Sequence, residues 1–292
     1  MEANETLEQL RPHLDVDKIR SWLAQQDQFT TDWAVTYFGE ALFFAKTISA
    51  KLGELPDSAR VLEIGGGIGF VSRVLALRGH RVTCFEPSSR GFSRMAALNQ
   101  LVESAWKPAP PSIEWRAEPF SSRLCGSERF GFIFATNVLQ HVASPASLVA
   151  EAASLLAPGG SARFICPNYS IPYDPHFNIP TFWSKRFAYR LFRRRIIAYP
   201  LQESPQALWE DLSFPSAGRL LRDLSRVGIS AHLSRDIALA YGERLSEPRF
   251  IERKGSTFRL LVRPLRRPLQ RTLELMPPRL LPLVDLRIDN PV

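Results

Sequence analysis

Cysteine is scarce in this sequence of 292 residues, and the three that occur, Cys84, Cys125 and Cys166, lie far apart. No CxxC pair is present, so neither a zinc site of paired cysteines nor a disulfide framework is expected. A protein with so few and such scattered thiols is expected in a reducing cytoplasm.

Long apolar runs are missing as well. No stretch reaches 18 uninterrupted apolar residues, so no membrane-spanning helix is expected. The first residues, "MEANETLEQLRPHLD", are acidic and do not have the basic start and apolar core of a secretory signal. Hydrophobic residues nevertheless make up 45% of the chain, an ordinary value for a folded protein. The length suits one large α/β domain with appendages, or two small domains.

Basic side chains are in excess, with a formal net charge of +8. The excess lies in residues 181–292, which hold 21 basic and 11 acidic side chains. Such a distribution suits an acidic partner, such as anionic lipid, a phosphorylated substrate or nucleic acid. An arginine-rich background without function explains it equally well, because 31 of the 37 basic residues are arginines.

The spacing of apolar residues predicts the fold. Within residues 5–52 apolar positions recur every three or four residues, which predicts N-terminal helices that end at Gly53. From residue 60 onward short apolar runs alternate with helical patterns, the signature of parallel βαβ units. The expected strands are 60–65, 81–87, 113–118, 130–137, 161–168, 230–239 and an edge strand at 281–290, with helices at 70–80, 89–102, 144–160 and 216–229. This rhythm predicts a doubly wound, mostly parallel seven-stranded α/β sheet.

The alternation of strand and helix patterns ends after residue 168. Residues 169–183 are rich in proline and aromatic residues, and they lead into a basic helical pattern at 184–197, which reads as an insertion over the sheet. Helical spacing places Trp183, Phe187, Ala188, Leu191 and Phe192 on one face and Arg186, Arg190, Arg193 and Arg194 on the other. Such a helix is either a lid packed on the sheet or a surface for an anionic membrane or a phosphorylated substrate. Residues 243–280 are expected to form Arg/Pro-rich helices.

The stretch "VLEIGGGIGF" follows the first expected strand. Its pattern is Glu63-x-Gly65-x-Gly67-x-Gly69, and Phe70 stands where a dinucleotide-binding loop needs its third glycine. A pyrophosphate site is therefore disfavoured. Glu86 ends the second strand, where a carboxylate accepts both hydroxyls of a ribose, so it supports nucleoside binding without choosing the cofactor.

The glycine pattern resembles motif I of the class I S-adenosylmethionine-dependent methyltransferases, whose loop cradles the amino-acid end and ribose of the cofactor. The resemblance covers about residues 55–168, including Pro-Gly-Gly at 158–160, and is weaker onward to about 240. It implies a Rossmann-like methyltransferase sheet, with Ala117 and Glu118 beside the adenine and Asn137 and Val138 as walls of the methionine half. Gly131 departs from the family's frequent Phe-Asp, which puts the geometry of that strand in doubt.

The same resemblance implies methyl transfer to an acceptor, and an oxygen acceptor needs its proton removed. His176, in "YDPHFNIP", and His141 both follow expected strands at the edge where doubly wound sheets bind ligands, so they are the candidate bases. Asp174 is a third candidate. A structural role stays open for each: a loop histidine for His176, a histidine satisfied by the backbone at a helix start for His141, and a turn residue for Asp174.

Four regions are therefore expected: helices at 1–54, the cofactor-binding core at 55–168, an acceptor-side lid at 169–215 and a C-terminal completion of the sheet at 216–292. The expected function is S-adenosylmethionine-dependent methylation of a small-molecule or lipid- or sugar-linked acceptor, with oxygen favoured and no metal. The protein is expected in the cytoplasm, with a peripheral contact to anionic membrane through residues 182–197. A nucleic-acid methyltransferase, a non-catalytic cofactor-binding subunit and an NAD-linked oxidoreductase are the alternatives.

Overall fold

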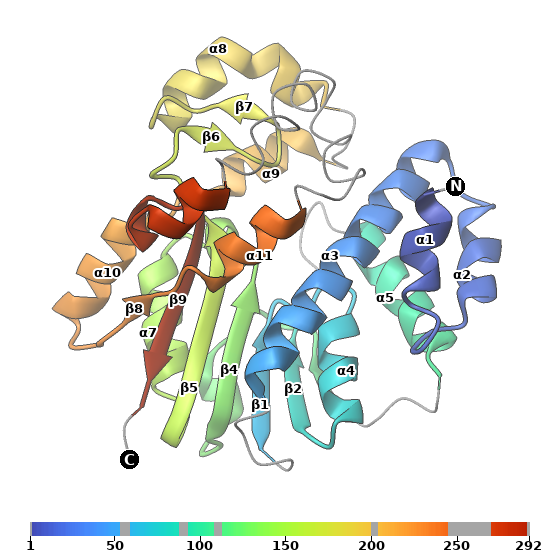
Figure 1. The fold of residues 1–292 in the computed structure, drawn as a ribbon, viewed down its shortest axis with the longest axis horizontal. Coiled ribbons are helices and arrows are strands. Elements are labelled where there is room, and N and C mark those ends of the chain that lie inside the picture. The colour runs from blue at the N-terminus through green and yellow to red at the C-terminus, as the bar shows by residue number, and fades with distance from the viewer. Residues whose placement is uncertain are drawn as a thin grey trace.

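A computed structural model of the chain describes residues 2–52, 59–87, 93–107, 113–199, 204–244 and 270–290. Within these ranges a mixed seven-stranded sheet lies between two layers of helices (Figure 1). The expected stop at Gly53 and most of the expected helices at 243–280 lie outside the described residues. Among the described helices, none combines the length and the apolar character that crossing a bilayer requires.

The strand order is β3-β2-β1-β4-β5-β9-β8. Five strands are parallel, namely β1 (Arg60–Ile64), β2 (Arg81–Phe85), β3 (Ile113–Arg116), β4 (Phe130–Thr136) and β5 (Leu156–Pro167). The other two are β8 (His232–Leu233) and β9 (Leu283–Asp289), and β9 runs antiparallel to both β5 and β8. The predicted doubly wound, mostly parallel sheet is confirmed.

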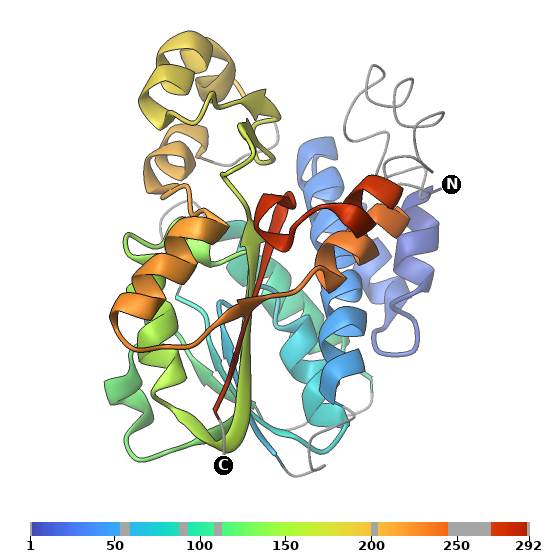
Figure 2. The same cartoon turned by 60° about the vertical axis from the view of Figure 1, so that its left-hand side comes forward.

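Both faces of the sheet are covered, which explains why its central strands are almost entirely apolar. One hydrophobic core joins the sheet to α1 (Glu2–Glu8), α2 (Val16–Leu23), α3 (Gln28–Leu52), α4 (Phe70–Leu77), α5 (Ser93–Ala105) and α11 (Asp236–Arg244). A second core joins the other face to α6 (Ser122–Cys125), α7 (Pro145–Ala153) and α10 (Ala217–Arg226). Alternate residues of β4 divide between the cores, with Phe132 and Phe134 in the first and Ile133 and Ala135 in the second. Figure 2 shows the two layers on either side of the sheet.

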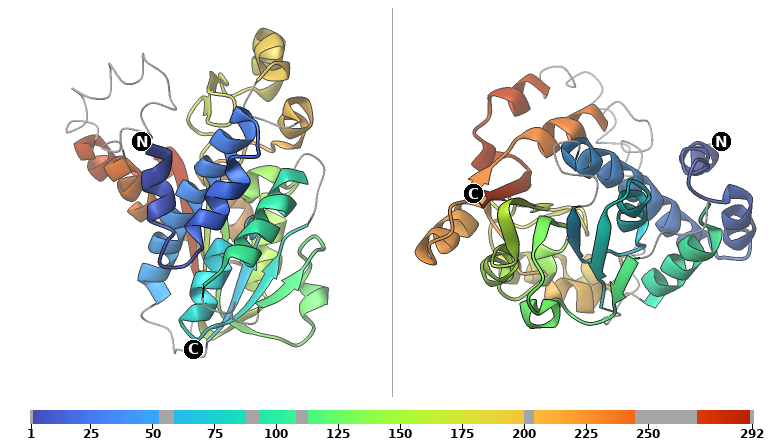
Figure 3. Two further views of the ribbon diagram at one scale, coloured as in Figure 1. Left: turned by 90° about the vertical axis from the view of Figure 1, so that its right-hand side faces the viewer. Right: turned by 90° about the horizontal axis from the view of Figure 1, so that it is seen from below.

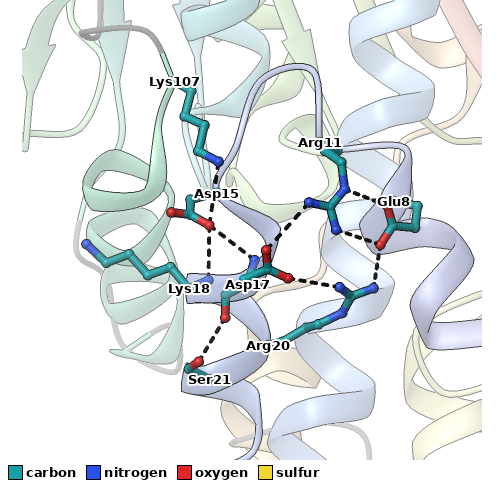
Figure 4. Close-up of polar contacts among 8 residues, drawn as sticks. All are labelled: Glu8, Arg11, Asp15, Asp17, Lys18, Arg20, Ser21 and Lys107. Carbon is teal, nitrogen blue, oxygen red and sulfur yellow. Dashed lines mark hydrogen bonds and ion pairs between the residues drawn. The ribbon is translucent and has the colours of Figure 1, made fainter.

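The N-terminal helices extend the first layer past the edge of the sheet (Figure 3). Asp15 begins α2 by accepting hydrogen bonds from the backbone N–H groups of Asp17 and Lys18, and its own N–H donates to Ala105 O at the end of α5 at 2.6 Å. Glu8 of α1 forms ion pairs with Arg11 and Arg20 (Figure 4). Because these pairs are exposed, burial of the apolar face rather than the ion pairs holds the helices in place.

Three expectations about secondary structure are wrong. Only His232 and Leu233 of the expected strand 230–239 are extended, because Ser234 and Asp285 accept the first backbone N–H groups of α11 and start a helix there. The terminal strand is not an edge strand, since β9 lies between β5 and β8. The expected helix at 144–160 ends at Ala153, and β5 begins at Leu156.

Gly131 lies at an irregular point of β4. The register between β4 and β5 shifts between Phe130 and Phe132. The departure at Gly131 therefore coincides with a local irregularity of the ladder, while the rest of the strand pairs regularly with β1 and β5.

The segment after β5 forms a separate small body over the carboxyl ends of the parallel strands (Figure 1). It contains β6 (Tyr173–Asp174), β7 (Ile179–Pro180), α8 (Lys185–Ile197) and α9 (Pro205–Asp211), and it has a hydrophobic core of its own. The single apolar face expected for α8 is wrong, because Ala188 and Phe192 pack inward whereas Phe187 and Leu191 are more than half exposed.

One buried ion pair fixes the antiparallel strand to the parallel sheet. The Nε and Nη2 atoms of Arg163 on β5 each donate to one oxygen of Asp285 on β9, both at 2.8 Å. The two side chains are 3% and 0% exposed, and Asp285 also accepts the N–H of Ile237. This fork geometry satisfies the charges that folding removes from water.

We predict that Asp285→Ala lowers the free energy of unfolding by about 3–5 kcal/mol, because it leaves the guanidinium of Arg163 buried and unpaired. The double variant Arg163→Met/Asp285→Leu, which removes both charges, should lose clearly less. Chemical denaturation followed by circular dichroism measures both values. Equal losses in the two variants would contradict this interpretation of the pair.

Candidate active site

The strand order reverses between β1 and β4, and β1 and β4 are neighbours although β2 and β3 come between them in the chain. In open α/β sheets this switch point, at the carboxyl ends of the strands, is where ligands bind. The glycine loop follows β1, Glu86 follows β2, Asn137 follows β4 and Asn168 follows β5. The fold therefore brings the predicted site residues to one edge of the sheet.

The glycine loop needs its glycines for two different reasons. Gly65, Gly67 and Gly69 have φ angles of 76°, 54° and 67°, in the left-handed region that disfavours side chains. A Cβ added to Gly65 would lie 2.2 Å from Cγ2 of Val138, so this position also requires close packing against the segment after β4. Among the described residues, a Cβ on Gly67 would approach only Sδ of Met95, at 3.7 Å, which is an ordinary contact without a clash.

Neighbouring elements hold this loop. The Gly65 N–H donates to Phe85 O of β2 at 2.7 Å, and the Asn99 amide of α5 donates to Gly67 O at 2.9 Å. The Gly67 N–H donates to the carboxylate of Glu86 at 2.7 Å. The loop is thus held from both β2 and α5.

Glu63 lies beneath the loop. It is 2% exposed, and its carboxyl accepts the hydroxyl of Ser72 from the first turn of α4, with Sγ of Cys84 at 4.0 Å. Burial raises its pKa to about 8, although the Ser72 hydrogen bond opposes the shift. Glu63 therefore ties the end of β1 to the start of α4.

Glu86 differs from Glu63 in its surroundings. It is half-buried at the end of β2, and burial raises its pKa while the N–H of Gly67 acts in the opposite direction. Burial raises the pKa of Tyr37 on α3, and the negative charges of Glu40 and Glu86 add smaller effects, so that ring is in the neighbourhood of Glu86. Sequence reasoning did not identify Tyr37 because its helix showed only an ordinary apolar spacing.

Ala117 and Glu118 follow β3 and are both exposed. The described residues show no hydrogen bond between Glu118 and the loop. Trp115, two residues earlier, does reach the loop, because its ring would lie 3.0 Å from a Cβ on Gly69. Trp115 was missed since a strand tryptophan carries no motif.

The segment after β4 connects the loop to the histidines. Asn137 has a φ of 57°, its N–H donates to Ile165 O at 2.8 Å, and its carbonyl accepts the amide of Gln140 at 2.9 Å. This turn places Val138 against Gly65 and begins the short helix η1 (Leu139–His141). Asn137 and Val138 therefore lie directly beside the glycine loop.

His141 and His176 are neighbours, as expected from their positions after β4 and β5. Their ring centroids are 5.4 Å apart at an interplanar angle of 76°. Burial, with a smaller effect of the charge of His176, lowers the pKa of His141 to about 3. His141 is consequently neutral at ordinary pH and a weak base.

His176 forms a hydrogen-bonded pair with Asp174. Its Nδ1 lies 3.2 Å from Oδ2 of Asp174, which is fully buried and also accepts the Tyr169 hydroxyl and the Phe177 N–H, each at 2.7 Å. Burial raises the pKa of Asp174, but the charge and hydrogen bond of His176, together with the Tyr169 and Phe177 donors, outweigh it and lower the pKa.

Tyr169 is a member of this cluster that sequence reasoning missed. Besides donating to Asp174, its ring stacks on Phe214 at 4.1 Å between centroids. Phe214 has a φ of 53° and comes from the segment after α9. Neither residue shows a pattern in the sequence, because their contact joins positions 45 residues apart.

We predict that Gly65→Ala lowers the free energy of unfolding by about 3 kcal/mol, because the new Cβ adds a clash with Val138 to the cost of a left-handed alanine. Gly67→Ala, which meets only the backbone cost, should lose about 1 kcal/mol. Adding Val138→Ala to Gly65→Ala should restore part of the loss. Chemical denaturation of the three variants measures this, and a double variant no more stable than the single one would argue against the clash.

We also predict a pH effect from Glu63. Its folded pKa of about 8 exceeds the ordinary value of 4.5, so between these values the folded protein keeps a proton that the unfolded chain has released. The contribution of this group to stability is therefore lost as pH rises through that window. Glu63→Gln stays neutral, so it should lose less stability than the natural protein between about pH 5 and about pH 8. Parallel slopes in denaturation experiments would contradict this.

Comparison with known proteins finds relatives over part of the chain. An uncharacterised protein of Mycobacterium tuberculosis (strain H37Rv) is 36% identical over 183 residues, which cover 63% of this chain and 61% of the relative. A ubiquinone biosynthesis O-methyltransferase of Methylobacterium sp. (strain 4-46) is 34% identical over 100 residues, covering 34% of this chain and 37% of that enzyme. The chain thus spans less than two thirds of the length of these relatives.

A solved structure of Haemonchus contortus phosphoethanolamine N-methyltransferase 2, in complex with phosphomonomethylethanolamine and S-adenosylhomocysteine, aligns with a TM-score of 0.48 at 15% identity, covering 92% of this chain and 59% of that one. The plantazolicin methyltransferase BpumL aligns with a TM-score of 0.46 at 14% identity, covering 95% of this chain and 92% of that one.

The family model described as "Methyltransferase domain" matches residues 39–228, a region that contains the glycine loop, Glu86, η1 and the His176–Asp174 pair. The chain therefore belongs to this methyltransferase family, whose methyl donor is S-adenosylmethionine.

Proposed function

We propose that this protein transfers a methyl group from S-adenosylmethionine to an oxygen atom of a small-molecule or lipid- or sugar-linked acceptor. The observation that carries the proposal is the arrangement of two groups at one edge of the sheet. The glycine loop with Glu86 lies on one side, and the His176–Asp174 pair lies on the other. The turn from Asn137 to His141 connects them.

The loop fits the donor. Gly67 carries no side chain, and among the described residues only Met95 lies near the place of a Cβ, so the backbone can approach the ribose and amino-acid end of the cofactor. The Glu86 carboxylate would accept the ribose hydroxyls, and its charge would repel a 2′-phosphate. Ala117 and Glu118 would lie at the adenine, and Asn137 and Val138 at the methionine half. Glu63, Gly65 and Gly69 would maintain the loop that holds the cofactor.

The donor, when bound, supplies a methyl group on a cationic sulfonium. The residues of the chain would hold the acceptor in line with that group. Positioning of this kind lowers the activation barrier by about 7–11 kcal/mol in favourable cases. The small body that contains α8 and α9 lies over the carboxyl ends of the strands (Figure 1), so it would exclude water from the reacting atoms.

His176 is the proposed general base. Asp174 has a lowered pKa and is therefore an ionised acceptor, so the ring proton of His176 belongs on Nδ1 and the lone pair on Nε2. Nε2 would take the proton from an acceptor hydroxyl. Asp174 would orient the ring and stabilise its charged form, and Tyr169 would hold Asp174 in place. His141 would line the acceptor side as a neutral ring.

Oxygen is favoured as acceptor atom because a hydroxyl needs a base and this site contains a histidine oriented as one. The O-methyltransferase relatives at 30% to 34% identity support the same choice. A lipid-linked acceptor is supported by the exposed aromatic and basic surface of α8. Together these features favour a lipid- or sugar-linked hydroxyl over a nucleic-acid base.

The first test is binding of S-adenosylmethionine by calorimetry, followed by release of S-adenosylhomocysteine in the presence of a cell extract that contains the acceptor. We expect His176→Ala to lower turnover at least tenfold and to leave cofactor affinity nearly unchanged, because the base does not hold the cofactor. Asp174→Asn should lower turnover in the same way, since an amide no longer fixes the Nδ1 proton.

Asn99→Ala serves as the matched control, because it removes a hydrogen bond to Gly67 and should weaken cofactor binding instead. Unchanged turnover of His176→Ala would eliminate this residue as the base. Cofactor binding without any S-adenosylhomocysteine release would favour a non-catalytic subunit, and binding of NAD in place of S-adenosylmethionine would overturn the proposal as a whole.

A further inference from the structure

Large apolar side chains are concentrated on one part of the exposed surface. The described residues include twelve large hydrophobic side chains that are exposed, and five of them lie within sixteen residues: Phe182, Trp183, Phe187, Leu191 and Ile197. Trp183 is 69% exposed and Leu191 is 56% exposed. Single exposed apolar residues are ordinary, but a concentration of this kind marks a surface that contacts something other than water.

These residues form one face of α8 and its start. Trp183, Phe187 and Leu191 are spaced by four residues, so they lie along one side of the helix. The opposite side is the packed one, because Ala188 and Ile196 are fully buried against the core that contains Phe177 and Trp209. Packing of the lid therefore does not account for the exposed face.

Arginines share this exposed face. Arg186, Arg190 and Arg194 are exposed, and Arg190 and Arg194 each lie three residues after Phe187 and Leu191 respectively. The whole of α8 holds six basic side chains and no acidic one. We call the five apolar residues together with these three arginines the α8 face.

The backbone before α8 adds a second observation. Phe182 and Trp183 have φ angles of 50° and 57°, a conformation that bulky side chains rarely adopt. The rings of Phe182 and Phe187 meet edge to face at 5.6 Å, and the indole N–H of Trp183 donates to Ser170 O at 2.8 Å. A strained turn thus holds the rings of Phe182 and Trp183 outward, where they bury little apolar surface and so contribute little to the stability of the fold.

We propose that the α8 face docks on the surface of an anionic phospholipid bilayer. Apolar and aromatic side chains on a helix that lies in the plane of the membrane enter the boundary between headgroups and acyl chains. Tryptophan suits this depth because its ring is apolar and its N–H is polar. The interleaved arginines pair with the phosphates and the negative headgroups. The exposed set includes aliphatic as well as aromatic side chains beside the arginines, which suits the apolar and charged layers of a bilayer surface together.

The α8 face is connected to the acceptor side of the proposed site. Arg195 of α8 donates to Asn178 O at 3.1 Å, and Trp183 bonds to Ser170, so the helix is joined at both ends to the segment that carries His176. Docking would bring that segment to the bilayer surface, where a lipid-linked hydroxyl is available. This last step rests on the proposed methyl transfer, whereas the docking surface does not.

Cosedimentation of the full chain with phosphatidylcholine vesicles, with and without phosphatidylglycerol, tests the proposal. We expect binding to the anionic vesicles that weakens with added salt. Phe187→Ser/Leu191→Ser should weaken it at least tenfold. Arg186→Gln/Arg190→Gln/Arg194→Gln should weaken it on the order of a hundredfold, since each cation near an anionic surface contributes about a fivefold effect.

The matched controls make the same kinds of substitution at exposed positions outside α8. Leu124→Ser/Val227→Ser removes two exposed apolar side chains, and Arg81→Gln/Arg123→Gln/Arg129→Gln removes three exposed arginines, both away from α8. Both controls should bind vesicles like the natural protein. Circular dichroism confirms that each variant is folded.

Three results would overturn the docking proposal: no binding to anionic vesicles, equal loss in the α8 variants and the controls, or a dimer in gel filtration that Phe187→Ser/Leu191→Ser dissociates. Binding of RNA by the arginines without binding of vesicles would overturn it too. Calorimetry with S-adenosylmethionine on the same variants separates the two proposals, because the α8 variants should keep cofactor affinity. Failure of vesicle binding leaves methyl transfer standing, and failure of cofactor binding leaves docking standing.

Discussion

The close approach of Gly65 to Val138 is the contact on which the arrangement of the site depends. It joins the loop after β1 to the turn after β4, the two strands between which the sheet reverses its order. Any side chain at position 65 would push these segments apart, because its Cβ would lie only 2.2 Å from Val138. The turn that carries Val138 also begins η1, so the position of His141 and its contact with His176 follow from the same approach.

Three carboxyl groups at this edge of the sheet have differently shifted pKa values because their surroundings differ. Burial raises the pKa of Glu63 to about 8, although the Ser72 hydroxyl opposes the shift, so Glu63 is a neutral link between β1 and α4. Glu86 is partly buried with a backbone N–H as its partner. Asp174 is fully buried, yet three donors, the Tyr169 hydroxyl, the Phe177 N–H and His176, lower its pKa, so it stays ionised. One chain thus raises the pKa of two carboxyl groups and lowers that of a third, through burial and through the number and charge of the partners.

In the small body over the sheet, the two sides of α8 have different surroundings. One side of α8 is buried with Phe177 and Trp209, and that core positions the loop from Tyr169 to Asn178. The other side exposes aromatic rings among arginines. Hydrogen bonds from Trp183 to Ser170 and from Arg195 to Asn178 join α8 and its start to the segment that carries His176. The docking proposed for the α8 face would therefore bring a bilayer close to the segment that carries His176.

The sequence by itself determined the parallel core of the sheet, the glycine loop and the placing of Glu86, Asn137 and the two histidines at one edge. These features depend on local periodicity and on turns a few residues long, which a single sequence records directly. Only the tertiary structure decided that Glu63 lies beneath the loop, that Asp174 and Tyr169 orient His176, that residues 236–244 are helical rather than extended, and that Phe187 faces solvent while Ala188 is buried. Each of these depends on a partner brought close only by folding, such as Asp285 for α11 or Trp209 for α8, and no local pattern identifies such a partner.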